Sequence, residues 1–194
     1  LHDVKTLPEL TAAIAAHAAR HPALPLVIGA GWQPGLFGDH NLTAAAIDAA
    51  TGTRPAVLYD SSFHNACLNT AALRLAGIGA KTSDPANGHI VRDAAGQPTG
   101  MLHEDAIQWA LERLPALSDD DHMAGLLAGQ AHAHAHGLTG VLDPRVEALE
   151  QRIYTRALAE NLLTMRVAGA AQVRESDTVE TALPRLLAMR AAAP

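Results

Sequence analysis

The chain has 194 residues, of which 48% are hydrophobic and 18% are charged, a balance typical of a globular protein rather than a disordered one. Its net charge of -6, with no basic patch, argues against nucleic acid as a partner, and no apolar run reaches the roughly 18 residues of a membrane-spanning helix. The single cysteine, Cys67, excludes an internal disulfide framework and fits a reducing compartment, so we expect a cytoplasmic protein.

Helical and strand patterns alternate along the chain. The first helix is predicted to begin at Thr6, a capping residue, and the second to end just before Gly52. We expect helices over residues 6–20, 42–51, 65–78, 104–114, 118–136, 147–161 and 177–192, and strands over residues 24–32, 55–60, 138–144 and 164–173. This alternation favours βαβ units around a parallel sheet, and it predicts an α/β fold class.

Two further features concern organisation. Residues 33–41 and 79–88 read as loops, and residues 88–100 predict a small β-hairpin excursion around the turn at 93–96. No internal linker is evident, so we expect one domain over residues 1–194. Because the chain starts at Leu1 without Met and stops in a helical pattern, we also expect it to be a portion of a longer protein.

The stretch "AHAHAHG", residues 131–137, places three histidines at alternate positions. On a strand this spacing would point two imidazoles to one side, as a metal site needs. On the predicted helix, His132 and His136 share a face while His134 points nearly the opposite way, and Gly137 would cap the helix. We interpret these residues as surface or capping histidines, and a metal pair at His132 and His136 remains the alternative.

Three stretches in order resemble a known family: "VIGAGWQPGLF" at 27–37, "PAVLYDSSFHNACLNTAALRLAGI" at 55–78 and "PANGHIVRDAAGQPTGMLHEDA" at 85–106. The pattern Gly-x-Gly-Trp, then His and Asn-Thr-x-Ala-Leu, then Gly-x-Ile-x-Arg-Asp-x-x-Gly-x-Pro-Thr-Gly is similar to that of amidohydrolase family 3. These are YtcJ-like metal-dependent hydrolases of the amidohydrolase superfamily. The chain departs from the pattern at Gln33, where the family often has Asp, and at Leu142, where it often has His.

The resemblance implies a (β/α)8 TIM barrel of parallel strands alternating with helices. It implies an enzyme in which water, activated by one or two divalent metals and usually by zinc, hydrolyses an amide, formamide or related C–N bond of a small-molecule substrate. The family's His-x-His strand would precede Leu1, and its later histidines and aspartate would follow Pro194. We therefore expect the central portion of a barrel, inactive in isolation.

Glu104 is the candidate metal ligand. It follows "PTGML" at the junction of a strand and a helix, where the family places an acidic residue and where barrel enzymes carry their catalytic groups. The alternative is an ordinary glutamate that the dipole of the helix favours at its N-terminus. His103 ranks lower, because on an extended segment its side chain points away from that of Glu104.

Three residues are candidates for substrate binding: His64, Trp32 and Asn69. His64 follows a strand, and its alternative is local hydrogen bonding in a loop. Trp32 would form a pocket wall or pack in the core, and Asn69 would support the pocket or cap a helix. No catalytic residue is assigned. Asp143 would orient a ligand or form a turn with Pro144, and Cys67 reads as a small buried helix residue.

A second hypothesis belongs to another class of protein. The chain would be a non-catalytic α/β module that self-associates or binds a partner, because a partial barrel leaves sheet edges and an apolar face uncovered. We accordingly expect a homo-oligomer, or association with the remainder of the same enzyme.

Overall fold

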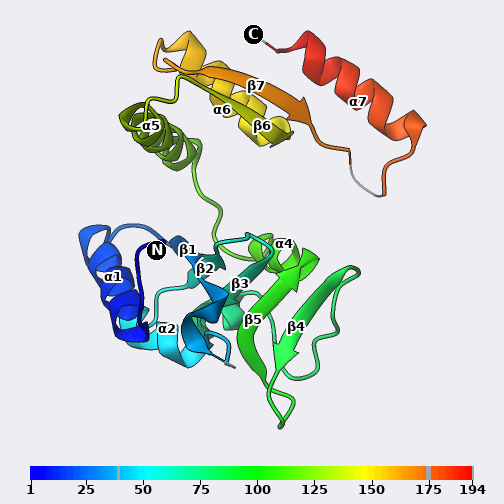
Figure 1. Cartoon of the computed structure of the whole chain (residues 1–194). Helices are drawn as coiled ribbons and strands as arrows, with labels where there is room; N and C mark the ends of the chain where they lie inside the picture. The colour runs from blue at the N-terminus through cyan, green and yellow to red at the C-terminus, as the bar shows by residue number, and fades with distance from the viewer. Residues whose placement is uncertain (39, 174–175, 194) are drawn as a thin grey trace. The chain divides into compact units, whose positions relative to one another are not determined.

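The computed structural model describes residues 1–38, 40–173 and 176–193, and its contacts form two compact units, Leu1–Ala116 and Leu117–Pro194 (Figure 1). Each unit is described by itself. Position 39, within the loop predicted over residues 33–41, lies outside the described residues. The prediction of one domain over residues 1–194 stays a prediction. Within the described ranges, no helix combines the length and the apolar character needed to cross a membrane.

The first unit is built on a five-stranded sheet with the strand order β1-β2-β3-β5-β4. Its strands are β1 (Val27–Trp32), β2 (Ala56–Asp60), β3 (Asn65–Leu68), β4 (Gly88–Arg92) and β5 (Pro98–Glu104). Its helices are α1 (Leu7–Arg20), the 3-10 helix η1 (Pro34–Phe37), α2 (Ala44–Thr51), α3 (Thr70–Leu75) and α4 (Asp105–Leu111). The chain is thus a mixed α/β protein, as predicted.

The prediction of parallel pairing is correct for β1 with β2, whereas β3, which was not predicted as a strand, pairs antiparallel with both β2 and β5. The helix predicted over residues 65–78 is wrong in its first half, because Asn65–Leu68 forms β3 between β2 and β5. Cys67 is buried, as expected, but it lies in this strand rather than in a helix. A short apolar run does not by itself distinguish strand from helix, and here pairing on both sides decides for strand.

The sheet of the first unit separates two apolar layers. On one face, side chains of α1 and α2 pack with alternate strand residues, including Leu58, Cys67 and Met101. On the other face, α3 and α4 pack with the intervening residues, including Ala66 and Leu102. The predicted hairpin excursion is confirmed as β4 and β5, and Gly96 takes a φ of 76° in its turn. Because helices cover both faces of this sheet, we look for ligand-binding side chains at the ends of its strands.

The second unit contains α5 (Asp119–Ala135), β6 (Gly140–Val146), α6 (Ala148–Ala159), β7 (Arg166–Ala171) and α7 (Val179–Ala191). Strands β6 and β7 pair parallel, as predicted. Its small core gathers Met123, Ile153 and Ala157 from α5 and α6. The strand predicted to close at Pro144 continues to Val146 with an irregularity in its pairing.

Candidate functional site

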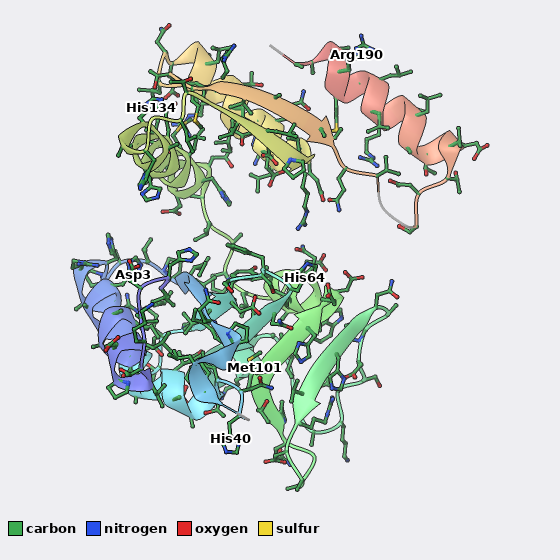
Figure 2. All side chains as sticks on the ribbon, in the orientation of Figure 1. Asp3, His40, His64, Met101, His134 and Arg190 are labelled. Carbon is green, nitrogen blue, oxygen red and sulfur yellow. The ribbon has the colours of Figure 1, made fainter. Side chains whose placement is uncertain are left out.

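Polar side chains gather at one end of the sheet of the first unit, which we call the rim. Because β1 and β2 are parallel and β3, β5 and β4 are antiparallel to their neighbours, β1, β2 and β5 end at the rim while β3 and β4 begin there. Figure 2 shows His64 at this end of the sheet and Met101 farther along β5. Strand pairing therefore brings residues 60–65 and 103–104 together.

His64 and Glu104, predicted separately as substrate-binding and metal-binding residues, are in direct contact. Nδ1 of His64 lies 3.0 Å and 3.1 Å from the two carboxylate oxygens of Glu104. The backbone N–H of Glu104 also donates to the carbonyl of His64 at 3.0 Å. The two side chains are 68% and 57% exposed, so they are open to a ligand. The sequence predictions thus point to one site, although the roles stay predictions.

Glu104 has a backbone conformation that few residues with a side chain adopt. Its φ is 52° and its ψ is -130°, at the point where β5 gives way to α4. Phe63, on the other side of the contact, also has a positive φ of 61°. Such conformations cost of order 1–3 kcal/mol each and cluster at functional sites. Two residues in such conformations therefore lie at the contact between His64 and Glu104.

A buried carboxylate, Asp60, lies at the end of β2. Its Oδ1 accepts hydrogen bonds from the backbone N–H and the hydroxyl of Ser62, at 3.0 Å and 2.7 Å, and its Oδ2 accepts from Nδ2 of Asn65 at 2.6 Å. Burial raises the pKa of Asp60, but the hydrogen bonds from Asn65 and Ser62 lower it by more, so its net pKa is below the ordinary value. The side chain is therefore a fixed anion.

Two histidines continue this polar row across the next two strands. His103 of β5 hydrogen-bonds through Nδ1 to Oδ1 of Asn65, and its ring stacks on that of His89 of β4 with centroids 5.9 Å apart. Nδ1 of His89 lies 2.6 Å from Asp84, which also accepts from Arg92 at 2.9 Å. The hydrogen bond from Arg92, aided by that from His89, lowers the pKa of Asp84 to about 2. The row therefore ends in a permanent ion pair.

His103 itself has a lowered pKa. Burial is the main cause and His89 adds to it, while the charges of Glu104 and Asp60 act in the opposite direction. The imidazole is therefore held toward its neutral form, in which one ring nitrogen carries a proton and the other a lone pair. Sequence reasoning ranked His103 below Glu104, and it did not identify Asp60 or Asn65. Asp60 and Asn65 point to the same face of the sheet because side chains alternate along a strand. This relation could not be predicted while residues 65–68 were expected to form a helix.

Asn69 lies away from the rim, which corrects its prediction as a substrate-binding residue. It is fully buried, its Oδ1 accepts from the backbone N–H groups of Ala56 and Ala72, and its Nδ2 donates to Thr51 and Arg54. Ala56 begins β2, whereas the rim is where β2 ends. Every polar atom of this side chain is used inside the protein, so helix capping and core support, the alternative from the sequence, describe it.

Trp32 is likewise a core residue in this structure. Its side chain is 1% exposed, its Nε1 donates to the carbonyl of Leu58 at 3.1 Å, and its ring meets that of Phe37 edge-on. A side chain with so little free surface has no contact to offer a substrate. The packing alternative therefore replaces the predicted pocket wall.

Asp143 belongs to the second unit, at an irregularity in the pairing of β6 with β7. It lies within β6, where it accepts from the hydroxyl of Tyr154 at 2.9 Å and from the backbone N–H of Arg145 at 3.0 Å. Burial, followed by the bond to Asp143, raises the pKa of Tyr154 to about 12. The hydrogen bond between the two side chains joins α6 to β6.

The histidines of "AHAHAHG" lie at the end of α5, as the helical interpretation predicts. The helix continues to Ala135, and Gly137 follows its cap with a φ of 77° (Figure 2 labels His134). The rings of His132 and His136 are 4.5 Å apart, and Nδ1 of His136 donates to the carbonyl of His132. Across the described ranges, no group of three or more His, Cys, Asp or Glu side chains is placed to hold a metal ion.

The donors at the rim match, in part, the metal that the resemblance implies. Carboxylate oxygen and imidazole nitrogen are ligands that zinc uses, and Glu104 and His64 supply one of each. A zinc site in an enzyme needs about three protein ligands. The described residues therefore fit a part of such a site and do not complete one.

Comparison with protein families places residues 1–191 under one model, described as the amidohydrolase family. Among curated proteins, an N-substituted formamide deformylase of Arthrobacter pascens is 36% identical over 157 residues, which is 78% of this chain and 29% of that protein. YtcJ of Bacillus subtilis (strain 168) is 34% identical over 142 residues, 71% of this chain and 27% of that protein.

Among solved structures, a metal-dependent hydrolase from Pyrococcus horikoshii OT3 superposes with a TM-score of 0.58 at 19% identity, covering 87% of this chain and 32% of that one. Another from Pyrococcus furiosus gives 0.56 at 21% identity, with coverage of 88% and 33%. At these identities the structural likeness shows the fold. The chain spans about a third or less of the length of the proteins it matches.

Proposed function

Because the chain belongs to the amidohydrolase family, we propose that it is a portion of a metal-dependent hydrolase that cleaves a C–N bond other than a peptide bond. The observation that carries the proposal is the exposed contact between Glu104 and His64 at the rim. The family resemblance had assigned these two residues to metal and substrate, and the fold brings them within 3.0 Å. We propose the rim as the side of the molecule where the reaction occurs.

We propose that the two units belong to a partial (β/α)8 barrel. The parallel pairs β1 with β2 and β6 with β7, together with the fold shared with the hydrolases of Pyrococcus, support this. In such a barrel the ends of parallel strands gather on one face, where catalytic groups lie.

Within this site each residue has a distinct task. Glu104 supplies a carboxylate toward a divalent metal, zinc in our proposal, and His64 orients that carboxylate through Nδ1. When bound, the metal polarises a carbonyl and lowers the pKa of water. The negative charges of Glu104 and Asp60 favour a cation at the rim. The further ligands are not among the described residues, and we propose that residues 1–194 alone are inactive.

One relative supports a proposal for the substrate class. We propose a small amide or an N-substituted formamide, because one relative is named for deformylating such compounds. A secondary formamide would present a carbonyl oxygen to be polarised and an N–H to be bound. The cytoplasm is the compartment we propose, in keeping with the free thiol of Cys67.

The test compares Glu104→Gln with Glu112→Gln in the natural protein that carries this segment. Glu112 is a matched control, since its side chain is 60% exposed at the end of α4 and away from the rim contact. We expect Glu104→Gln to lower kcat/KM for an N-substituted formamide by about 100-fold or more and to lower bound zinc, as loss of a ligand should. Formate release and elemental analysis measure the two. If Glu104→Gln keeps the zinc and the activity of Glu112→Gln, the metal role is wrong.

A second candidate function is a self-associating module without chemistry. The observation that favours it is an apolar stripe on α7, where Val179, Leu183 and Leu187 recur every four residues and are 71%, 50% and 56% exposed. An exposed apolar stripe of this kind marks an interaction surface. Light scattering should then give about twice the 20.2 kDa of one chain, and Leu183→Lys should restore the monomer. A monodisperse unmodified monomer would count against this candidate.

A further inference from the structure

Four neighbouring strands each contribute one side chain to a continuous polar row at the rim. The register aligns Asn65 with His103 and His103 with His89, and Asp60 follows on from the pairing of Tyr59 with Ala66. These side chains lie on the face of the sheet that also carries Leu58, Cys67 and Met101, because strand side chains alternate. The row is therefore set by the sheet and not by a loop.

The hydrogen bonds of the row have only one consistent direction. Asp60 is ionised and can only accept, so the group of Asn65 facing it must be the NH₂. The opposite side of the same amide is then the carbonyl oxygen, which faces Nδ1 of His103. A carbonyl can only accept, so Nδ1 of His103 must carry the proton. Neutral His103 then has its lone pair on Nε2.

This tautomer is not the one that a free imidazole side chain prefers, which is the form protonated on Nε2. The hydrogen-bonded chain from Asp60 through Asn65 to His103 is here called the relay. Ser62 fixes the carboxylate at its far end, because the backbone N–H and the hydroxyl of Ser62 both donate to Oδ1 of Asp60. Within the described residues, Nε2 of His103 has no hydrogen-bond partner, and the side chain is half-buried at the rim. An imidazole held in this way can accept a hydrogen bond at Nε2 from a bound ligand.

We propose that Asp60 and Asn65 are positioning residues that hold His103 with its lone pair on Nε2, and that this nitrogen accepts the N–H of a secondary amide or formamide substrate. The first half stands on the hydrogen bonds alone. The second half rests on the proposed function, and it makes His103 a residue that selects secondary over N,N-disubstituted amides.

The first half is tested by the tautomer itself. Long-range ¹H–¹⁵N NMR on metal-free protein at pH 8, where imidazole is neutral, distinguishes protonated Nδ1 from protonated Nε2. We expect the Nδ1–H form for His103 in the unmodified protein and a shift to Nε2–H in Asn65→Leu. His89 is the internal control, because Asp84 and not Asn65 holds its Nδ1. The exposed His134 supplies the free-imidazole reference.

A second, conservative variant tests the same relay in case Asn65→Leu does not fold. In Asp60→Asn the backbone N–H of Ser62 must still meet an oxygen, so the new NH₂ turns toward Asn65. The Asn65 amide should then rotate and present its NH₂ to His103, which should switch to Nε2–H although no neighbour of its ring was substituted. His103 as Nε2–H in the unmodified protein, or unchanged in both variants, would overturn the relay.

The second half is tested, in the natural protein that carries this segment, by the ratio of kcat/KM for a secondary formamide to that for its N-methylated tertiary analogue. One hydrogen bond should give the unmodified protein a roughly three- to tenfold preference, which His103→Phe and Asn65→Leu should remove. An unchanged ratio would overturn the substrate assignment. Absence of hydrolysis in the natural protein that carries this segment would instead contradict the proposed function. The tautomer of His103 is measured without substrate, so its result is independent of that outcome.

Discussion

Single side chains decide how the first unit is held together, and Asn69 is the clearest case. It joins three segments: the start of β2 through Ala56, the first turn of α3 through Ala72, and the end of α2 through Thr51. The sequence motif that contains Asn69 predicted a place in the pocket or a helix cap. Only the cap is compatible with its complete burial.

Asn69→Ala should lower the free energy of unfolding by about 3 kcal/mol. The substitution leaves the N–H groups of Ala56 and Ala72 without partners, and each buried unsatisfied donor costs about 1–3 kcal/mol. Urea denaturation measures the change. Asn41→Ala, on an exposed residue, is the matched control. Equal stability of the two variants would contradict the structural role assigned to Asn69.

At the scale of elements, the sequence predicted helix ends correctly where the capping residues lie next to the helix itself. Ser118 begins α5 with a complete capping box, in which its hydroxyl accepts from Asp121 at 3.1 Å and Asp121 accepts from its N–H at 2.9 Å. Gly137 follows the end of the same helix in the left-handed conformation that the sequence predicts. By contrast, the strand character of Asn65–Leu68 depends on β2 and β5, which are distant in sequence.

Ser118→Ala should destabilise the second unit by about 1 kcal/mol, the usual effect of losing an N-cap. The loss should be local, so hydrogen exchange of the first-turn amides of α5 should accelerate more than exchange in α6. Ser118→Thr keeps an oxygen at the same position and should retain most of the stability. Similar exchange rates in Ser118→Ala and the unmodified chain would show that the capping box does not hold this helix.

At the scale of the whole molecule, each unit contains a pair of side chains that could donate to a metal. Glu104 and His64 meet at the rim of the first unit, and His132 and His136 meet on α5 of the second. Neither pair has a third ligand within the described ranges. The chain matches the amidohydrolase family over residues 1–191, and it covers about a third or less of the relatives it matches.

Residues 1–194 should accordingly retain no stoichiometric zinc after dialysis, because two ligands do not form a stable site. Elemental analysis of the dialysed protein measures this. The comparison variant replaces His132, His134 and His136 by alanine. If the unmodified chain retains one equivalent of zinc and this variant does not, the helix histidines bind the metal, contrary to our interpretation. One equivalent retained in the variant but lost in Glu104→Gln would place a complete site at the rim.

The sequence by itself determined the features that depend on neighbouring residues: the helix caps, the hairpin of β4 and β5, the helical placement of the three alternating histidines, and the family through its ordered motifs. These signals are local because capping, turn geometry and side-chain periodicity act over a few residues. Tertiary structure alone decided that residues 65–68 form a strand antiparallel to β2 and β5, that Asn69 and Trp32 are buried, and that Asp60, Asn65 and His103 form one row. Strand register joins residues some 40 positions apart, and no local preference encodes that distance.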